Sequence, residues 1–324
     1  MTKALATQRQ PAAMTLYTEQ AQTYARASKA ANTLRAYASA WKKFAAWAES
    51  VGRPALPAEV GAVVDYLAKL AEDGARVSTI SVARAAISAA HALAHLPDPA
   101  KSEDVKMVMA GISRKLGAAP VKKSPLTLDE LRAATATLPA TLAGKRDRAL
   151  LLLGWAGAFR RSELVALDMA DSVRRAGELK ITVRRSKTDQ TGEGLVKVIP
   201  ALKDKTICPV EALREWEDAA HIRSGPIFRQ IDRWGNVRAR AMTSQCVALT
   251  VKAAARRAGL DWRRFSGHSL RSGFITAAAL AGVESRDIMA QSGHKSFDVM
   301  RSYIQDAGLG AKRATRAAFG EKRP

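Results

Sequence analysis

Cysteine is nearly absent from this chain of 324 residues, which holds only Cys208 and Cys246. Two cysteines cannot supply a disulfide scaffold or a cysteine-rich zinc site, so a reducing compartment is expected. The segment Met1–Pro11 is polar and lacks the apolar core of a signal peptide. The longest apolar run, 149–159, is interrupted by glycine and tryptophan and falls short of the ~20 residues of a membrane span. We therefore expect neither a secreted nor a membrane-spanning protein.

Acidic residues are also scarce, because 30 Asp and Glu stand against 52 Lys and Arg, a formal net charge of +22. Such an excess predicts a polyanionic partner, since a neutral or acidic partner would leave the self-repulsion uncompensated. Nucleic acid is the first candidate, and an anionic membrane surface is the second. The hydrophobic content of 47% is ample for buried cores and excludes a disordered tail protein. At roughly 100–200 residues per domain, the length predicts two domains.

Motifs for nucleotide-dependent or metal-dependent chemistry are missing. The chain has no GxxxxGK[ST] loop, no HExxH motif and no Cys/His zinc spacing. His91 and His95 stand four residues apart on an expected helix and could hold a metal. No third ligand is evident, so a surface or half-buried helix face is the simpler interpretation. No acidic cluster suits a pair of Mg²⁺ ions. We expect no metal and no cofactor, so that any chemistry on phosphodiesters would be metal-free.

The first third of the chain has helical periodicity. Apolar residues at three- and four-residue spacing predict a helix from Thr33. Ser78 is expected to cap a later helix, and the remaining apolar stretches lie at 60–70, 80–94 and 105–116. The pattern predicts a small helical domain of four to five helices over residues 12–118. The stretch GAAPVKKSP carries little apolar content and predicts a linker at 119–125.

The remainder mixes helices with strands. Thr127 and Glu130 have the spacing of a capping box and predict a helix start, and a second helix is expected over 146–157. Two runs rich in β-forming residues, 179–184 and 195–199, predict an antiparallel hairpin. Further helices are expected at about 209–220, 243–258, 268–281, 284–291 and 296–306. The fold class is therefore mainly α, with a second, α+β domain over 126–308 that contains a small antiparallel β-sheet, and a basic tail over 309–324.

Two short boxes hold residue types that act on phosphodiesters. Metal-free phosphoryl transfer needs fixed positive charge on the phosphate oxygens, an in-line nucleophile and a proton donor for the leaving oxygen. In GAFRRSEL, Arg160 ends an apolar helix and Glu163 can brace it. Arginine suits this task because its planar fork donates two hydrogen bonds and stays charged. In GHSLR, His268 and Arg271 share one face at a helix start, a position that favours anions.

With His294 in a Gly-His pair and Tyr303 nine residues later, these boxes resemble the tyrosine recombinase (phage integrase) family, including its Cre-like members. The shared order is G-x-x-R-x-x-E-L, a lysine on a β-hairpin, H-x-x-R, G-H and then tyrosine, over about residues 126–306. The resemblance implies a catalytic domain with the DNA breaking–rejoining fold, preceded by a helical core-binding (SAM-like) domain. It also implies a site-specific DNA recombinase or integrase that acts through a 3′-phosphotyrosine intermediate.

The resemblance also assigns roles to individual residues. In this family two arginines hold the scissile phosphate, a lysine protonates the leaving 5′ oxygen and a tyrosine attacks the phosphorus; the matching positions here are Arg160, Arg271, Lys187 and Tyr303. His268 would then assist proton transfer, His294 would hydrogen-bond the phosphate or position the nucleophile, and Glu163 would brace the first arginine. The lysine is the least specific match, because the hairpin region offers the competitors Lys180, Arg184, Arg185 and Lys197.

Tyr303 stands out by elimination, because the other four of the five tyrosines lie at or before residue 66. A free tyrosine has a pKa of about 10, so only about 0.1% is phenolate near pH 7, a deficit of about 4 kcal/mol. Nearby arginine, lysine and histidine side chains can reduce this deficit by favouring the anion. A phosphotyrosine keeps the energy of the phosphodiester, so no ATP is required and a 5′-hydroxyl from another strand can reverse the attack.

The family resemblance further implies how the protein meets DNA. The two domains would form a C-shaped clamp on double-stranded DNA with specific recombination sites. Candidate contacts to backbone or groove, each of which could equally be an ordinary solvated residue, are Thr33, Arg35, Lys43, Ser78, Thr79, Arg84, Lys122 and Lys123. The implied assembly is a homotetramer on DNA, monomeric or dimeric off it, that exchanges strands in two sequential steps through a Holliday junction.

Other expectations concern partners, place and the tail. The resemblance is compatible with an accessory directionality or bending factor as a further partner, and we expect no membrane partner. For a bacterial or phage-encoded protein, it implies a cytoplasmic location in association with the nucleoid. The segment Leu309–Phe319 is expected to dock on a neighbouring subunit and gate Tyr303. Deleting the residues after Asp306 should then abolish recombination, and full activity of the truncated protein would reject this idea.

Two other functions fit parts of the same pattern. A type IB topoisomerase-like enzyme would use the same cleavage but relax DNA as a monomer, and a plasmid relaxation assay at single-turnover stoichiometry separates the two. A non-catalytic DNA-binding accessory protein is the other alternative. Taken singly, each box also has a structural explanation: Arg160 and Glu163 as a helix-surface ion pair, His268 and Arg271 as a helix-start decoration, and Tyr303 as a core aromatic. The matched order and spacing favour the recombinase.

Overall fold

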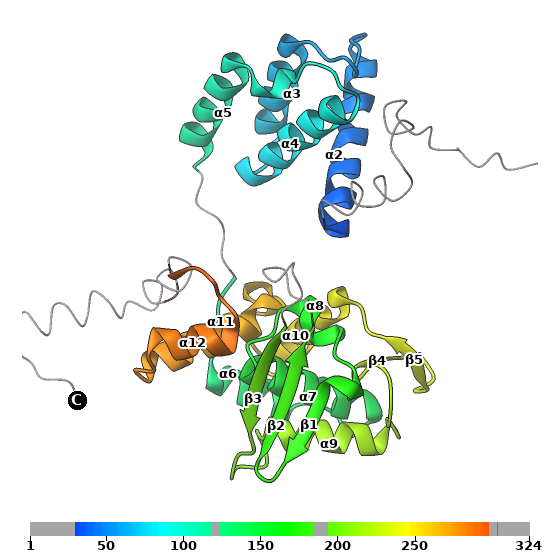
Figure 1. The fold of residues 1–324 in the computed structure, drawn as a ribbon, viewed down its shortest axis with the longest axis vertical. Helices are drawn as coiled ribbons and strands as arrows, with labels where there is room; N and C mark the ends of the chain where they lie inside the picture. Colours follow the sequence, from blue (N-terminus) through cyan, green and yellow to red (C-terminus); the bar gives the residue numbers. More distant parts are fainter. Residues whose placement is uncertain (1–29, 118–122, 185–193, 298–302, 304–324) are drawn as a thin grey trace, which may run out of the picture. The chain divides into compact units, whose positions relative to one another are not determined.

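The computed structural model describes residues 30–117, 123–184, 194–297 and 303 (Figure 1). The chain divides into two units, 1–121 and 122–324, and this division falls within the stretch 119–125 that the sequence predicts as a linker. The end of that stretch belongs to the second unit: Ser124 N donates to Arg264 O at 2.9 Å, and Lys123 Nζ donates to Arg263 O at 2.6 Å. The tail 309–324 lies outside the described residues.

The first unit is helical, as the periodicity predicts. Its described elements are α2 (Ala31–Ser50), α3 (Val60–Glu72), α4 (Val77–Leu93), the short 3-10 helix η2 (Pro99–Lys101) and α5 (Glu103–Leu116). One apolar core joins them, with Phe44, Leu67, Ile80, Ile87 and Val105 fully buried. Each helix therefore turns its apolar stripe to a shared interior and leaves its charged face exposed.

Two predictions within this unit are wrong in detail. Ser78 does not cap α4, which begins at Val77, one residue earlier. His91 is neither on the surface nor half-buried: it is fully buried, its Nε2 accepts from Ala58 N at 2.9 Å, and its Nδ1 lies 2.9 Å from Ile87 O. His95 follows the end of α4 at a positive φ of 54°, so the two histidines do not share a helix face. Among the described residues no group of three or more metal-ligating side chains is found.

The second unit holds more helices and two sheets. Its helices are α6 (Leu128–Ala136), α7 (Leu142–Ala156), α8 (Arg161–Val165), η3 (Met169–Asp171), α9 (Pro209–Ala219), α10 (Ser244–Arg257), η4 (Trp262–Arg264), α11 (His268–Leu280) and α12 (Ser285–Ser292). The capping box of Thr127 and Glu130 begins α6 as predicted. The helix α7 begins earlier than predicted, at Leu142, because Thr141 accepts from Gly144 N at 3.2 Å. The helix expected over 296–306 lies mostly outside the described residues.

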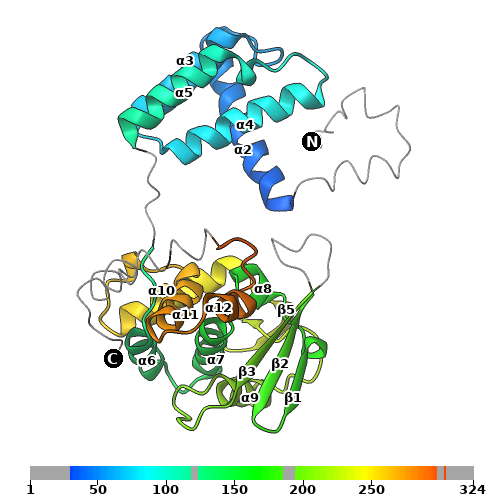
Figure 2. The same cartoon turned by 60° about the vertical axis from the view of Figure 1, so that its left-hand side comes forward.

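The larger sheet has the antiparallel order β1–β2–β3, with β1 at Ser172–Arg175, β2 at Glu178–Val183 and β3 at Leu195–Pro200. In Figure 2 it stands at one side of the helices of this unit. The predicted hairpin is β2 and β3, and their register places Ile181 opposite Lys197. The prediction that the fold is mainly α with a small antiparallel sheet is confirmed.

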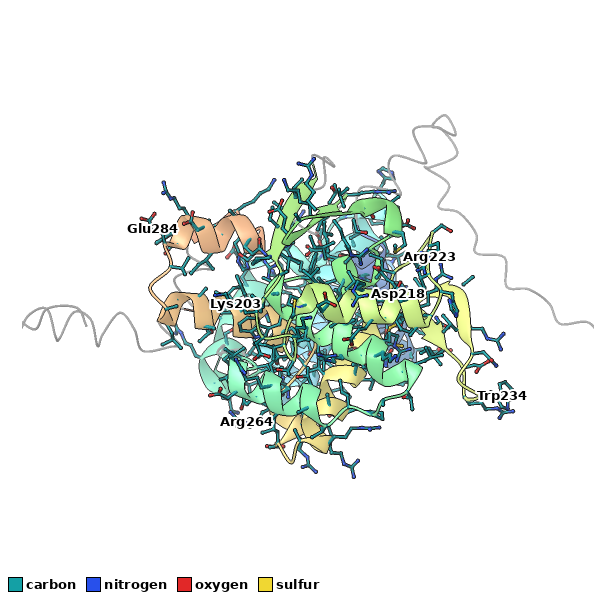
Figure 3. All side chains as sticks on the ribbon, turned by 90° about the horizontal axis from the view of Figure 1, so that it is seen from below. Lys203, Asp218, Arg223, Trp234, Arg264 and Glu284 are labelled. Carbon is teal, nitrogen blue, oxygen red and sulfur yellow. The ribbon has the colours of Figure 1, made fainter. Side chains whose placement is uncertain are left out.

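Two features of the sheets are not predicted from the sequence. The strand β1 adds an outer strand to the predicted hairpin, and a second hairpin, β4 (Arg229–Ile231) and β5 (Val237–Ala241), lies where no strand is expected. Both escape notice because they are short and rich in arginine, so they lack an apolar alternation. Trp234, 68% exposed, lies at the outer end of the second hairpin (Figure 3).

The helix α7 is the core of this unit. Its residues 149–154 are all buried, because this second half of the helix is apolar on every side. The helix α11 packs closely on it at Gly273, where an added Cβ would lie 2.0 Å from Leu126 O and 2.7 Å from Trp155 Nε1. This close approach brings the start of α11 beside the end of α7. Among the described residues, no helix combines the length and apolar character that crossing a bilayer demands.

Candidate active site

Arg160 and Glu163 form a tight turn after α7. Arg160 is the N-cap of α8; its backbone N donates to Glu163 Oε2 at 2.9 Å, and its guanidinium donates to Glu163 Oε1 at 2.6 Å. The side chain of Glu163 is 2% exposed, whereas that of Arg160 is 18% exposed. The carboxylate thus holds the arginine from the protein interior through two hydrogen bonds, as in a capping box. The brace expected from the sequence is present in the geometry.

Arg271 lies in the first turn of α11 and is 1% exposed. One nitrogen of its guanidinium donates to Ala158 O at 2.7 Å, and another lies 2.9 Å from His294 Nε2. Burial, together with repulsion from Arg160, lowers the pKa of Arg271 to about 10. The group therefore stays charged at neutral pH. Two guanidinium groups from separate parts of the sequence thus act on one another electrostatically.

His294 follows the left-handed Gly293, whose φ is 69°, at the end of α12. Because Arg271 can only donate, His294 Nε2 must accept, and the proton of the neutral ring sits on Nδ1. That nitrogen lies 2.9 Å from Ser292 Oγ, which accepts it. Burial, followed by the charges of Arg271 and Arg160, lowers the pKa of His294 to about 3. The imidazole is therefore neutral at physiological pH.

Tyr303 lies between the two histidines of the site. Its Oη is 2.8 Å from His268 Nε2, and its ring centroid is 6.4 Å from that of His268 and 6.0 Å from that of His294. Its phenol also acts on Arg271, whose pKa it raises. His268 keeps part of its surface in contact with solvent. Its pKa is nevertheless lowered, first by the partial burial of the ring and then by the nearby guanidiniums of Arg271, Arg161 and Arg160. The structure thus brings Arg160, Glu163, His268, Arg271, His294 and Tyr303 together.

Comparison with known proteins agrees with this geometry. The family model described as the phage integrase family matches residues 125–308. An integrase/recombinase XerD homolog of Selenomonas ruminantium is 40% identical over 286 residues, which is 87% of this chain and 84% of that protein. The chain belongs to the phage integrase family. It is a site-specific DNA recombinase of the tyrosine type.

More distant relatives of this tyrosine recombinase agree. Recombinase Cre of Escherichia phage P1 is 24% identical over 296 residues, covering 85% of this chain and 84% of that protein. A lambda integrase tetramer bound to a Holliday junction has a TM-score of 0.59 at 19% identity, covering 89% of this chain and 75% of that one. At this identity the second comparison concerns the fold alone.

The other predicted site residues of the recombinase are dispersed. Lys187 and Lys122 lie outside the described residues. Lys123 is exposed and bonded to Arg263 O. The remaining candidates for DNA contact are on α2 and α4 of the first unit: Thr33, Arg35, Lys43, Ser78, Thr79 and Arg84. Arg35, Lys43, Ser78 and Thr79 are exposed there, while Thr33 and Arg84 are half-buried. Their role in DNA contact stays a prediction.

The importance of Lys197 is not predicted from the sequence. The residue appears there only as a competitor of Lys187, yet its side chain is fully buried in β3. Burial, and then the charges of Arg271 and Arg160 against that of Glu163, lowers its pKa to about 7. A signal for this was present: in LVKVIP, Lys197 has the same parity as Ile199, so a two-residue period turns both inward. A lysine at an inward strand position is rarely an ordinary solvated side chain.

Proposed function

We propose that this recombinase cuts and rejoins double-stranded DNA through a transient 3′-phosphotyrosine on Tyr303. The observation that carries the proposal is the 2.8 Å separation of Tyr303 Oη and His268 Nε2. Because the pKa of His268 is lowered, its imidazole is neutral near pH 7 and can accept the phenol proton. The tyrosine thus has a base within hydrogen-bond reach, which is the first requirement for a nucleophile.

In the proposed cleavage step, one phosphorus–oxygen bond replaces another. Tyr303 Oη forms a bond to the phosphorus while the bond between phosphorus and the 5′ oxygen breaks, and the phenol proton passes to His268. Arg160 and Arg271 hold the non-bridging oxygens, where negative charge accumulates. His294 holds Arg271 through Nε2 and orients the tyrosine, whose ring centroid lies 6.0 Å from that of His294. Lys187 supplies the proton that the leaving 5′ oxygen takes up, a role that rests on the family resemblance.

Rejoining reverses these bonds. A 5′-hydroxyl from a partner strand attacks the phosphotyrosine, releases Tyr303 and restores a phosphodiester without ATP. We propose that two such exchanges occur in sequence through a Holliday junction within a homotetramer, with monomers or dimers off DNA. The fold shared with a lambda integrase tetramer bound to a Holliday junction supports this assembly. The net charge of +22 favours DNA binding in either state.

The biological setting follows from the same proposal. The substrate is double-stranded DNA with specific recombination sites, with an accessory directionality or bending factor as a further partner. The recombinase would work in the cytoplasm beside the nucleoid, where such DNA lies. The XerD homolog of Selenomonas ruminantium supports a bacterial setting.

Covalent trapping tests the nucleophile. A suicide substrate, nicked so that the 5′-hydroxyl fragment diffuses away, should accumulate a protein–DNA adduct with the wild-type chain. Tyr303→Phe should form no adduct, because phenylalanine has no oxygen to attack, while its DNA affinity in a gel-shift assay should stay within about twofold. Tyr66→Phe is the matched control, since Tyr66 belongs to the buried core of the first unit. An adduct that persists in Tyr303→Phe contradicts the assignment.

A further inference from the structure

Lys197 places a titratable group in the protein interior. It is 0% exposed, in the middle of β3, opposite Ile181 of β2. Moving an ammonium group from water into a protein costs several kcal/mol unless partners compensate it. An aliphatic residue would fit the inward face of a strand without that cost. The contacts of the ammonium group therefore indicate what the lysine contributes.

The contacts of Lys197 are the ends of two helices. Its Nζ donates to Gly157 O at 2.7 Å and to Gln291 O. Gly157 is the C-cap of α7, and Gln291 lies in the last turn of α12. The last carbonyls of a helix have no partner within the helix and carry a partial negative charge, which favours a cation. The ring of Phe159 adds a cation–π contact, with its centroid 4.9 Å from Nζ.

Both helix ends lead directly into the active site. Arg160 follows Gly157 by three residues, and His294 follows Gln291 by three. The position of each helix end therefore decides where a phosphate-binding side chain begins. Lys197 joins the two ends through a single nitrogen atom, although Gln291 follows Gly157 by 134 positions in the sequence.

Three consecutive carbonyls at the end of α7 accept bonds from three different elements. Ala156 O accepts from Gln291 Nε2 of α12 at 3.1 Å, Gly157 O from Lys197 of β3 at 2.7 Å, and Ala158 O from Arg271 of α11 at 2.7 Å. Arg271 is itself a site residue, whereas Lys197 and Gln291 only bond the backbone of the turn. The turn that carries Arg160 is thus held from three directions.

We propose that Lys197 is a positioning residue, which joins the end of α7 to the end of α12 so that Arg160 and His294 are held at one spacing before DNA binds. This inference rests on the proposed function. The amine of Lys197 is bonded to two backbone carbonyls of the protein, and the proton donor of the proposed reaction is Lys187. The effect of Lys197 is to reduce the reorganisation needed to reach the transition state, where a displacement of 1 Å can lower the rate about 100-fold.

The charges that face Lys197 limit how it can act. Glu163 of the α8 turn opposes the repulsion from Arg160 and from Arg271 of α11, and His294, which lies after α12, is neutral near pH 7. Both the ammonium and the neutral amine have at least two N–H donors, so both can bond the two carbonyls. The joint between the helix ends therefore persists on either side of neutral pH. A methionine removes every donor while keeping a similar length and an apolar stem.

The test compares Lys197→Met with Lys203→Met, an exposed lysine three residues beyond the end of β3 that Figure 3 labels. Single-turnover cleavage of the suicide substrate gives the rate constant, and a gel-shift titration gives the DNA affinity. We expect Lys197→Met to lower the rate constant by about 10- to 100-fold, with DNA affinity within about twofold. Lys203→Met should leave both unchanged. A merely structural role would reduce the active fraction but not the rate constant of the molecules that react.

A second variant keeps the test decisive if Lys197→Met does not fold. Gln291→Met removes only the side-chain bond to Ala156 O and leaves Gln291 O as acceptor for Lys197. It should lower the cleavage rate constant in the same direction but less, with unchanged DNA affinity. The inference is overturned if folded Lys197→Met, or Gln291→Met in its place, cleaves at the wild-type rate constant. Absence of a Tyr303-dependent adduct in the wild-type chain would instead contradict the proposed function.

Discussion

At the residue scale, the site is a pocket of positive charge that protein groups stabilise only in part. Arg160 lowers the pKa of Arg271, and Glu163 works against that repulsion. Both histidines are neutral near pH 7, so Nε2 of His294 can accept from Arg271 and Nε2 of His268 can accept from Tyr303. An anion between the two guanidiniums would relieve their mutual repulsion. The two guanidiniums therefore favour a phosphate, and the same charges would serve both its binding and the reaction.

The pH dependence of stability follows from His294. Its pKa is lowered from 6.5 to about 3, so below pH 6.5 the unfolded chain binds a proton that the folded chain does not. The free energy of unfolding should fall as the pH drops from about 6.5 towards 3, and this group should contribute no slope above 6.5. Urea unfolding in the absence of DNA, repeated at several pH values, measures this pH dependence of the free energy of unfolding.

His294→Gln is the comparison for that measurement, because its amide can still meet Arg271 but does not titrate. The difference in unfolding free energy between wild type and His294→Gln should shrink as the solution is acidified. Curves that stay parallel between pH 7 and pH 4.5 would contradict the assignment.

At the element scale, the short helix α8 depends on a single carboxylate. Glu163 accepts from the backbone and the side chain of Arg160, so it both starts the helix and aims the guanidinium. A five-residue helix cannot be stable by propensity alone. Its geometry is therefore set by this hydrogen-bonded turn and by the burial of Leu164.

Glu163→Gln should destabilise the second unit by about 1–3 kcal/mol, because a charge-assisted pair with a buried carboxylate is replaced by a neutral one. Chemical denaturation measures the change. Glu211→Gln is the matched control: Glu211 also pairs with an arginine three residues away, at 2.8 Å, but Arg214 is exposed. That substitution should change stability by less than about 1 kcal/mol. Equal losses in the two variants would show that burial of Glu163 has no energetic consequence.

At the scale of the whole molecule, the described residues form one large hydrophobic core in each unit, and the second unit has a further small cluster of Ile275, Ala279 and Ile288. One large core is built from residues of α2, α3, α4 and α5, together with η2, and the other from residues of the second unit. Each core joins elements of one unit only, so each unit contains the apolar burial that its own folding requires. The excess of positive charge, by contrast, belongs to the chain as a whole.

A fragment of residues 123–324 should therefore fold alone. We expect a single cooperative urea transition, because the hydrophobic core of this unit contains no residue of the first unit. Its midpoint should match one of the transitions of the full chain, followed by circular dichroism. The Tyr303→Phe fragment should give the same midpoint, which separates folding from catalysis. A fragment that unfolds without cooperativity would show that the first unit stabilises the second.

The sequence alone predicted the helices well where an apolar stripe or a cap was present, as for α6 with Thr127 and Glu130. It failed where the pattern was short or charged, as in β1 and the β4–β5 hairpin. His91 was misjudged because a buried histidine with two backbone partners leaves no trace in periodicity. Lys197 was undervalued because its partners, Gly157 O and Gln291 O, are backbone atoms distant in sequence.

The types, order and spacing of the recombinase's residues alone predict which side chains come together in the candidate site, because this information is local in the sequence. It also determined the helical character of both units, since periodicity needs only near neighbours. The folded arrangement alone shows which ring nitrogen of His294 accepts, how far burial lowers each pKa, and that a lysine joins the ends of two helices next to site residues. These properties depend on distance and desolvation between segments far apart in the chain, and neither is encoded in any one stretch of it.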